Sequence, residues 1–423
     1  MKAERSLMNS KHWICLSVLN FLLVAVFGLL MRLKFLFPIP WLDQKNIMHA
    51  HSHFAFAGWV SQALMVFLIA AVFRLKSEEG IPKKYQPILW FNLLSSYGML
   101  ISFSITGYAF FSISFSFLSV LASYWFAIIL WKDLKKTRLP LSIIVLIKAS
   151  LIYLALSSLG TYALVILKVT HQLDPLKQLA SVYFFLHFQY NGWFFFACLS
   201  LASYWIYDKT GKEIMFAGFA KVYAFTVLPA YFLSVLWWKG FPSWLYVLLL
   251  LTVTLQVILW TILLLRFLKI KRQDSKLSLS KETTLIWVCV VLAVSVKLIL
   301  QAISIIPSLS QLVYGFRPIV IAYLHLVLLV IISLFILGYA FQNQSLQLNK
   351  GIRFGIYGLL FGIFLNEFML MIQGVAGLLR FPIYGTHEAL GIAAVIMVIS
   401  ISLILANQAK SSCKEMPYSK TSF

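Results

Sequence analysis

Long apolar segments recur along the whole of this 423-residue chain, and they constrain its fold more than any other feature. About 20 apolar residues let a helix cross the roughly 30 Å hydrocarbon layer of a bilayer, where backbone groups must be satisfied within the segment. Twelve such segments can be recognised, at about 13–36, 47–74, 86–107, 109–131, 140–167, 178–206, 215–238, 242–268, 283–307, 317–341, 352–378 and 383–406. The sequence therefore predicts an all-α polytopic membrane protein with about twelve transmembrane helices, here called spans 1 to 12.

Composition agrees with this fold class. Hydrophobic residues make up 61% of the chain and charged residues only 11%, whereas a soluble domain carries about 25% charged residues. The connections are short, so we expect one twelve-helix domain over 1–406 and a polar cytoplasmic tail over 407–423. The four cysteines are far apart and form neither a CxxC metal motif nor a disulfide framework.

The net charge of +22 is interpreted as a topology signal rather than a nucleic-acid signal. If the N-terminus is cytoplasmic, most Lys and Arg fall on that side. Eight of the 35 fall opposite: Arg32, Lys34, Lys45, Lys168, Lys177, Lys239, Arg317 and Arg380. Such a bias favours both termini inside. We expect an integral protein of a bacterial inner (cytoplasmic) membrane, in contact with membrane lipid and without a nucleic-acid partner.

Six histidines lie inside apolar spans at a common predicted depth. They are His49, His51, His53, His187, His325 and His387. In an up-and-down bundle, spans 2, 6, 10 and 12 all run in the same direction, and each carries its histidine in its first third to half. An ionisable side chain in hydrocarbon is costly and marks a functional site by default. The pattern therefore indicates a shared heme or metal site.

Span 2 offers three candidate ligands. His49 and His53 are four residues apart and share a helix face, while His51 points elsewhere. Neutral imidazole is a common ligand of heme iron, copper and zinc. The alternative is a histidine-rich cap wetted by lipid headgroups. Small residues around Gly58 would leave room for a flat macrocycle, or would equally permit close helix packing.

Span 6 places His187 beside further polar residues in the hydrocarbon, namely Gln189, Tyr190 and Asn191. Tyr190, three residues after His187, is expected on the same face. A lone membrane histidine could also serve only as a hydrogen-bond partner for a neighbouring helix. We interpret His187 as a metal ligand and His187 with Tyr190 as a candidate catalytic pair.

Spans 10, 11 and 12 complete the candidate set. Span 10 contributes His325, with Arg317 at its mouth, and span 12 contributes His387 behind Arg380. Either arginine could pair with heme propionates, because guanidinium matches carboxylates bidentately, or could meet lipid headgroups. Span 11 adds Glu367 within the membrane.

Twelve spans with histidines near one end of spans 2, 6 and 10 resemble subunit I of the heme-copper oxidase superfamily, and the stretch from His49 to Trp59 is similar to its heme-ligand helices. The resemblance implies that His325 and one of His49, His51 and His53 ligate a low-spin, b-type heme. It also implies that His187 ligates a copper or non-heme iron. Span 7 holds no histidine and span 10 holds one, whereas the family places metal ligands in span 7 and usually two in span 10.

A second resemblance is to the NnrS family of twelve-span heme- and copper-containing proteins linked to nitric oxide stress. A third hypothesis is a transporter in which the histidines and Glu367 relay protons or metal ions. The oxidase resemblance implies an oxidoreductase that handles O2 or NO with electrons from a quinol or a cytochrome. Only scattered polar residues, among them Lys148 and Lys297, could carry protons from the cytoplasmic side. We therefore expect gas chemistry without efficient proton pumping.

Overall fold

A computed structural model describes residues 8–172, 174–238, 240–306, 316–381 and 383–414. Within these ranges the protein is a bundle of antiparallel helices, and the one β-type pairing is an isolated bridge between Asn9 and Gly80. Eleven of the described helices are long and apolar enough to cross a membrane. A twelfth span runs over Pro175–Thr210 as three helical segments that follow one another without a gap. The expected all-α polytopic fold is confirmed, and the chain is an integral membrane protein.

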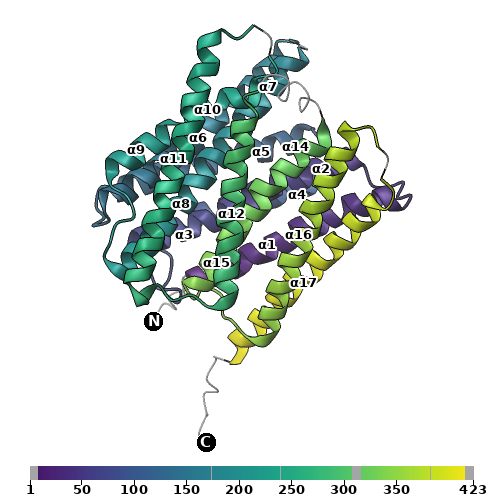
Figure 1. Cartoon of the computed structure of the whole chain (residues 1–423). Helices are drawn as coiled ribbons and strands as arrows, with labels where there is room; N and C mark the ends of the chain where they lie inside the picture. The colour runs from purple at the N-terminus through teal and green to yellow at the C-terminus, as the bar shows by residue number, and fades with distance from the viewer. Residues whose placement is uncertain (1–7, 173, 239, 307–315, 382, 415–423) are drawn as a thin grey trace, which may run out of the picture.

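Eight of the twelve spans are single regular helices. They are α1 (Ser10–Leu36), α4 (Gln86–Thr106), α5 (Phe110–Leu134), α6 (Leu141–Val169), α11 (Ser243–Gln273), α12 (Lys281–Ile303), α16 (Lys350–Leu378) and α17 (Thr386–Lys414). Figure 1 shows that α1 begins and α17 ends at the same end of the bundle, at the lower left of the view. An even number of spans requires this arrangement.

The other four spans are interrupted. Their segments are α2 (Gln44–Phe54), η1 (Ala55–Ser61) and α3 (Gln62–Phe73); α7 (Pro175–His187), η2 (Phe188–Phe194) and α8 (Phe195–Thr210); α9 (Ala217–Phe225), α10 (Val227–Ala230) and η3 (Tyr231–Val235); and α14 (Arg317–His325), η5 (Leu326–Ser333) and α15 (Leu334–Gln342). In three of them, η1, η2 and η5, the interruption is a π-helical segment. These are three of the four spans in which the sequence places histidines at a common depth; the fourth, span 12 with His387, is the regular helix α17.

Helix ends follow local sequence signals. The side chains of Asn9, Asp43, Ser280 and Asn349 each accept a hydrogen bond from a first-turn N–H of α1, α2, α12 and α16. Such caps satisfy backbone donors that have no partner inside the helix. Gly211 ends α8 in the left-handed conformation, which glycine adopts without a steric penalty.

The π segments start directly after the histidines. His187 precedes η2, His325 precedes η5, and η1 begins two residues after His53. A π turn inserts an extra residue into the helix and shifts the face on which later side chains appear. It also loosens the backbone ladder, so freed carbonyl groups must find other donors in the membrane.

Asparagines on neighbouring helices supply those donors in span 2. Asn20 of α1 donates its Nδ2 hydrogen to the carbonyl oxygen of Gly58 at 2.6 Å, and Asn92 of α4 donates to that of Ala57 at 3.1 Å. Both asparagines are fully buried. A buried polar side chain is stable only when it is hydrogen-bonded, so the asparagines and the π segment require each other.

Two indole hydrogen bonds join the π segments to one another. Trp59 of η1 donates Nε1–H to Ser333 of η5 at 2.9 Å, and Trp193 of η2 donates to Ser61 of η1 at 3.3 Å. Both tryptophans are almost completely buried. Spans 2, 6 and 10 therefore meet at the centre of the bundle, just below their histidines.

Packing changes at the depth of the histidines. In α15, Leu334 to Phe341 are all buried, whereas every side chain from Pro318 to Leu326 is only partly accessible. All seven residues of η2 are buried, against only Ser181 and His187 in α7. A helix that faced lipid on one side would alternate exposed and buried positions. Uniform partial accessibility in α14 indicates loose packing of this helix. The end of the bundle where α2, α7 and α14 begin is here called the histidine end.

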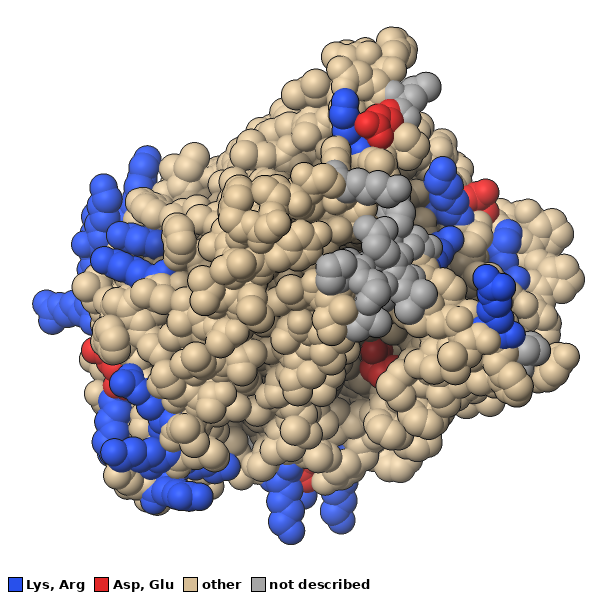
Figure 2. Space-filling model, turned by 45° about the horizontal axis from the view of Figure 1, so that its top comes forward, with Lys and Arg blue, Asp and Glu red and all other residues tan. Residues whose placement is uncertain are grey.

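Lys and Arg side chains gather at both ends of the bundle, and a broad band of mostly uncharged surface lies between them (Figure 2). This distribution fits a membrane-embedded belt. Which end faces the cytoplasm stays a prediction from the Lys and Arg bias. The expected boundary between domain and tail at 406 and 407 falls inside α17, which continues to Lys414. The rest of the tail, 415–423, and Lys239 lie outside the described residues.

Candidate functional site

His51 and His325 come together at the histidine end. Their imidazoles are close enough to interact electrostatically, although 274 residues separate them in the chain. Arg317, at the start of α14, places a guanidinium nitrogen 2.9 Å from Sδ of Met48 in α2. The first turns of α2 and α14 therefore lie side by side. A pair of ligands from spans 2 and 10 requires this arrangement.

Both imidazoles have one nitrogen occupied by a backbone carbonyl. Nδ1 of His51 lies 3.0 Å from the carbonyl oxygen of Val24, and Nδ1 of His325 lies 2.8 Å from that of Ile321. A carbonyl can only accept, so Nδ1 carries the hydrogen in each ring. Nε2 is then the lone-pair nitrogen, and in the described structure neither Nε2 has a hydrogen-bond partner. Metal-ligating histidines in proteins are commonly oriented in this way.

A glycine of α1 leaves space beside His51. A Cβ atom added to Gly28 would lie 3.4 Å from Cε1 and 3.8 Å from Nδ1 of His51. A side chain at position 28 that extends beyond Cβ would therefore reach the imidazole ring. Four residues further along the same helix face, Arg32 interacts electrostatically with His51, His325 and Glu367 of α16. From the sequence, Arg32 entered only the count of positive residues. In the structure Arg32, rather than the predicted Arg380, interacts electrostatically with both histidines.

His49 and His53 face a different part of the bundle. His53 stacks on Phe103 of α4 with ring centroids 4.4 Å apart, and its Nε2 lies 3.2 Å from the hydroxyl of Tyr108. Burial raises the pKa of Tyr108, so this hydroxyl stays protonated and can donate to His53. His49 packs edge-on against Tyr108 at 4.6 Å, and its buried Nε2 has no described partner. The predicted shared face of His49 and His53 is thus turned toward α4, away from α14.

His187 has partners at both ring nitrogens. Nε2 lies 2.9 Å from the carbonyl oxygen of Val227, which can only accept, so Nε2 carries the hydrogen. Nδ1 therefore accepts from Nδ2 of Asn191 at 3.1 Å. His187 is 1% exposed. To ligate a metal ion it would have to give up one of these two buried hydrogen bonds.

Tyr190 does not contact His187. Its hydroxyl is hydrogen-bonded to Tyr323 of α14 and to Ser234 of η3. The i+3 and i+4 positions of a regular helix would bring both Tyr190 and Asn191 beside His187. In the structure, where a π segment begins at Phe188, Asn191 makes the hydrogen bond to the histidine.

The remaining candidates are dispersed. His387, near the start of α17, stacks on Phe35 of α1 at 5.1 Å, and its buried Nδ1 has no described partner. Arg380 lies between α16 and α17 with a left-handed φ of 55° and an exposed side chain. These two residues lie toward the edge of the bundle formed by α1, α16 and α17.

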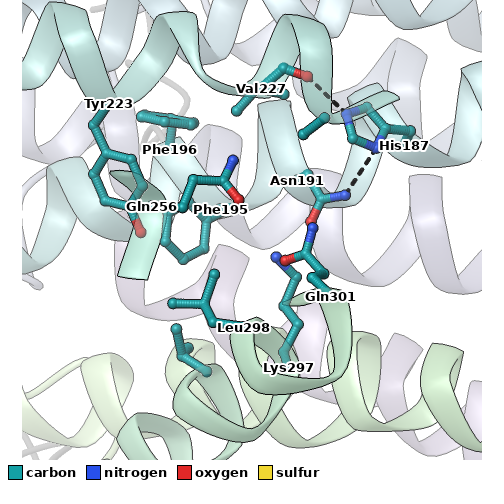
Figure 3. Close-up of a pocket in the computed structure, with 12 residues that line it drawn as sticks. His187, Asn191, Phe195, Phe196, Tyr223, Val227, Gln256, Lys297, Leu298 and Gln301 are labelled. Carbon is teal, nitrogen blue, oxygen red and sulfur yellow. Dashed lines mark hydrogen bonds between the residues drawn. The ribbon is translucent and has the colours of Figure 1, made fainter. Parts of the chain in front are cut away.

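A small cavity lies beside His187 (Figure 3). Its volume is about 20 Å³, and spans 6, 7, 8 and 9 line it. Polar side chains dominate one side: His187, Asn191, Gln256, Lys297 and Gln301. From the sequence, Lys297 was noted only as a scattered polar residue, and Gln256 and Gln301 were not predicted as site residues. Polar residues in the middle of apolar spans are the signal that could have found them.

The donor set differs between a heme and a second metal ion. His51 and His325 offer two oriented, unpartnered Nε2 atoms in a loosely packed region, which fits bis-histidine heme ligation. Around His187 the donors do not fit a second metal: both nitrogens are engaged, and α9 to η3 carry no histidine. In the described part of the chain, no group of three or more His, Cys, Asp or Glu side chains is placed to hold a metal ion.

Comparison with known proteins agrees with the architecture. No protein-family model matches the sequence, and no curated protein matches it. A solved structure described as a heme-copper terminal oxidase dimer matches over 95% of this chain and 84% of its own, with a TM-score of 0.66 and 14% sequence identity. The chain has a heme-copper oxidase-like fold. At this sequence identity the similarity establishes the fold alone. The chemistry of the protein has to be inferred from its own residues.

Proposed function

We propose that this protein is a heme-binding membrane redox protein, with a b-type heme iron held between His51 and His325. The observation that carries the proposal is the orientation of these two histidines, each fixed through Nδ1 with Nε2 left available. A bis-histidine heme supplies reversible one-electron transfer when bound. In the chain itself, Val24 and Ile321 orient the ligands, and Gly28 keeps the space beside His51 open.

Electrons would come from a quinol in the membrane or from a cytochrome partner. Partial accessibility at the histidine end, in contrast to the fully buried region below it, supports electron entry from that end. Arg32 would contribute a positive charge beside both ligands, and such a charge favours the reduced, less positive state of a nearby centre. Glu367, in turn, interacts with Arg32.

Redox handling of O2 or NO is a second candidate function. An iron with two histidine ligands has no open position, so gas chemistry would need another histidine to hold a further heme. The buried, unpartnered Nε2 of His49 and Nδ1 of His387 are specific observations in favour, because a buried polar nitrogen without a partner is costly. Neither belongs to the pair assigned above.

A spectrum of the purified protein tests the main proposal. Protein from heme-replete cells should show a Soret band and, after reduction, a sharp α band with about one low-spin heme per chain. His51→Ala and His325→Ala should each reduce this heme at least about tenfold, because each removes an axial ligand. His49→Ala is the matched control and should retain it, since His49 faces Tyr108.

A folded but colourless wild-type protein would refute heme binding and favour the transporter hypothesis. Loss of the low-spin band in His49→Ala with retention in His51→Ala would move the ligand assignment to the other face of α2. Elution of each variant as a single species in detergent distinguishes ligand loss from misfolding.

A further inference from the structure

The cavity beside His187 has an unusual set of unsatisfied groups. Three side-chain amide oxygens at its wall are buried without a hydrogen-bond donor: Oδ1 of Asn191, Oε1 of Gln256 and Oε1 of Gln301. Their side chains are 6%, 5% and 7% exposed. Buried polar atoms in folded proteins nearly always have a partner, so three in one small space indicate a missing donor.

The orientation of two of these amides is fixed by other contacts. Asn191 uses its Nδ2 on Nδ1 of His187, which leaves Oδ1 for the cavity. Gln256 uses its Nε2 on the hydroxyl of Thr226, at 3.1 Å, and on the carbonyl oxygen of the same residue at 3.4 Å. Exchanging the oxygen and nitrogen of either amide would break these hydrogen bonds. These hydrogen bonds therefore fix Oδ1 of Asn191 and Oε1 of Gln256 as acceptors without a donor.

Lys297 of α12 is the only cation on the cavity wall within the described residues, and its side chain extends toward the amides of Gln301 and Asn191 (Figure 3). It is 7% exposed, and its Nζ lies 5.7 Å from the centroid of the Phe195 ring. No hydrogen bond from this amine to the three oxygens is formed in the described structure. It interacts electrostatically with His187.

One small molecule between these groups would supply the hydrogen-bond donors that the amide oxygens lack. A water molecule needs about 10–15 Å³ of such space and two to four polar partners, and the cavity provides about 20 Å³ and four. Water can accept from the lysine amine and donate to two amide oxygens, and a second lysine hydrogen is free for the third.

We propose that this cavity is a binding site for a single water molecule, which accepts from the amine of Lys297 and donates to two of the three amide oxygens of Asn191, Gln256 and Gln301, while the amine itself donates to the third. The amine of Lys297 then stands beside the histidine to which the sequence resemblance assigned a second metal ion. None of the twelve described lining residues is a carboxylate, so a metal cation at this site would meet no anionic ligand. The site does not depend on heme at His51 and His325.

Two measurements on the purified full-length protein test this proposal. Metal analysis should find no copper, zinc or iron beyond the iron of extractable heme, and His187→Ala should leave that content unchanged. A cryo-EM map that resolves other internal waters should show one peak in the cavity, within hydrogen-bond distance of Nζ of Lys297. Lys297→Met should lose this peak, because the apolar side chain removes the donor.

Lys148→Met is the matched control, because Lys148 is the other lysine inside an apolar span and its Nζ lies 5.1 Å from the ring of Trp131 in α5, outside the cavity. The control should keep the peak. A stoichiometric second metal in the wild-type protein that is lost in His187→Ala would overturn the proposal, and so would an empty cavity in the wild-type map. The wild-type measurements decide the matter even if Lys297→Met does not fold, and a colourless protein with the water in place would refute the heme proposal alone.

Discussion

The three histidines of span 2 differ in what surrounds each ring. Sequence spacing could predict that His51 faces away from His49 and His53, but not which face meets span 10. That depends on how α2 is rotated against its neighbours. The structure turns His51 toward α1 and α14, and His53 toward Tyr108. Of the three candidate heme ligands in span 2, we therefore propose His51, because helix packing turns it toward span 10.

Gly28 provides a test of this assignment that leaves both ligands in place. Gly28→Leu should displace the imidazole of His51 and lower bound heme about tenfold, because a Cβ atom alone would already lie 3.4 Å from Cε1 of His51 and leucine adds three more carbons beyond it. Gly28→Ala should stay near the wild-type level, since its Cβ would stand 3.4 Å from Cε1 of His51. Heme per chain, from the pyridine hemochrome spectrum, measures both. Unchanged heme in a folded Gly28→Leu protein would contradict the position of the ligand.

The helical elements were largely predictable, and their interruptions were not. Apolar length located all twelve spans, most of them to within about five residues, as for 86–107 against Gln86–Thr106, although α17 continues eight residues past its predicted end at 406. No local sequence signal marks a π turn, because the residues of η5 are as apolar as any regular membrane helix. Nor could helix spacing decide between the two polar neighbours of His187: Asn191 makes the hydrogen bond to the histidine, while the Tyr190 hydroxyl interacts with Tyr323 and Ser234. Buried asparagines such as Asn20 and Asn92 are the sequence signal that helices at this depth need extra donors.

Asn92 is therefore expected to stabilise span 2 far more than an ordinary polar residue of α4. Asn92→Leu should remove the donor to the carbonyl oxygen of Ala57 and to Oε1 of Gln62, and lower the unfolding free energy by at least about 2 kcal/mol. Ser102→Ala is the control on the same helix, because that hydroxyl bonds only to Gly98 within α4. Denaturant titration in detergent micelles measures both. Equal stabilities for the two variants would show that water or a neighbouring group satisfies η1 instead.

At the scale of the whole molecule, the likeness to a heme-copper terminal oxidase concerns the path of the chain, while proton movement depends on side chains that the fold does not dictate. The candidates for a proton path are mostly engaged locally. Ser157 donates to Leu154 and accepts from Gln189, and Thr161 donates to Ser158. Hydroxyl groups that donate to carbonyls of their own helix do not form a chain across the bilayer. Lys297 lies on the wall of a small cavity, and Lys148 lies beside the ring of Trp131.

We therefore predict that any turnover of O2 or NO occurs without proton pumping. Proteoliposomes supplied with a quinol should consume one of the gases, while an internal pH dye reports no proton translocation beyond the protons that the chemistry itself uses. The physical reason is that a pump needs continuous hydrogen-bonding groups from the opposite end of the bundle, whereas the hydroxyl groups of Ser157 and Thr161 donate to carbonyls of their own helix. An uncoupler added in parallel should leave the proton count per gas molecule unchanged. Robust O2 consumption with proton ejection that the uncoupler abolishes would show that water molecules connect these residues and that the chain works as a pumping oxidase.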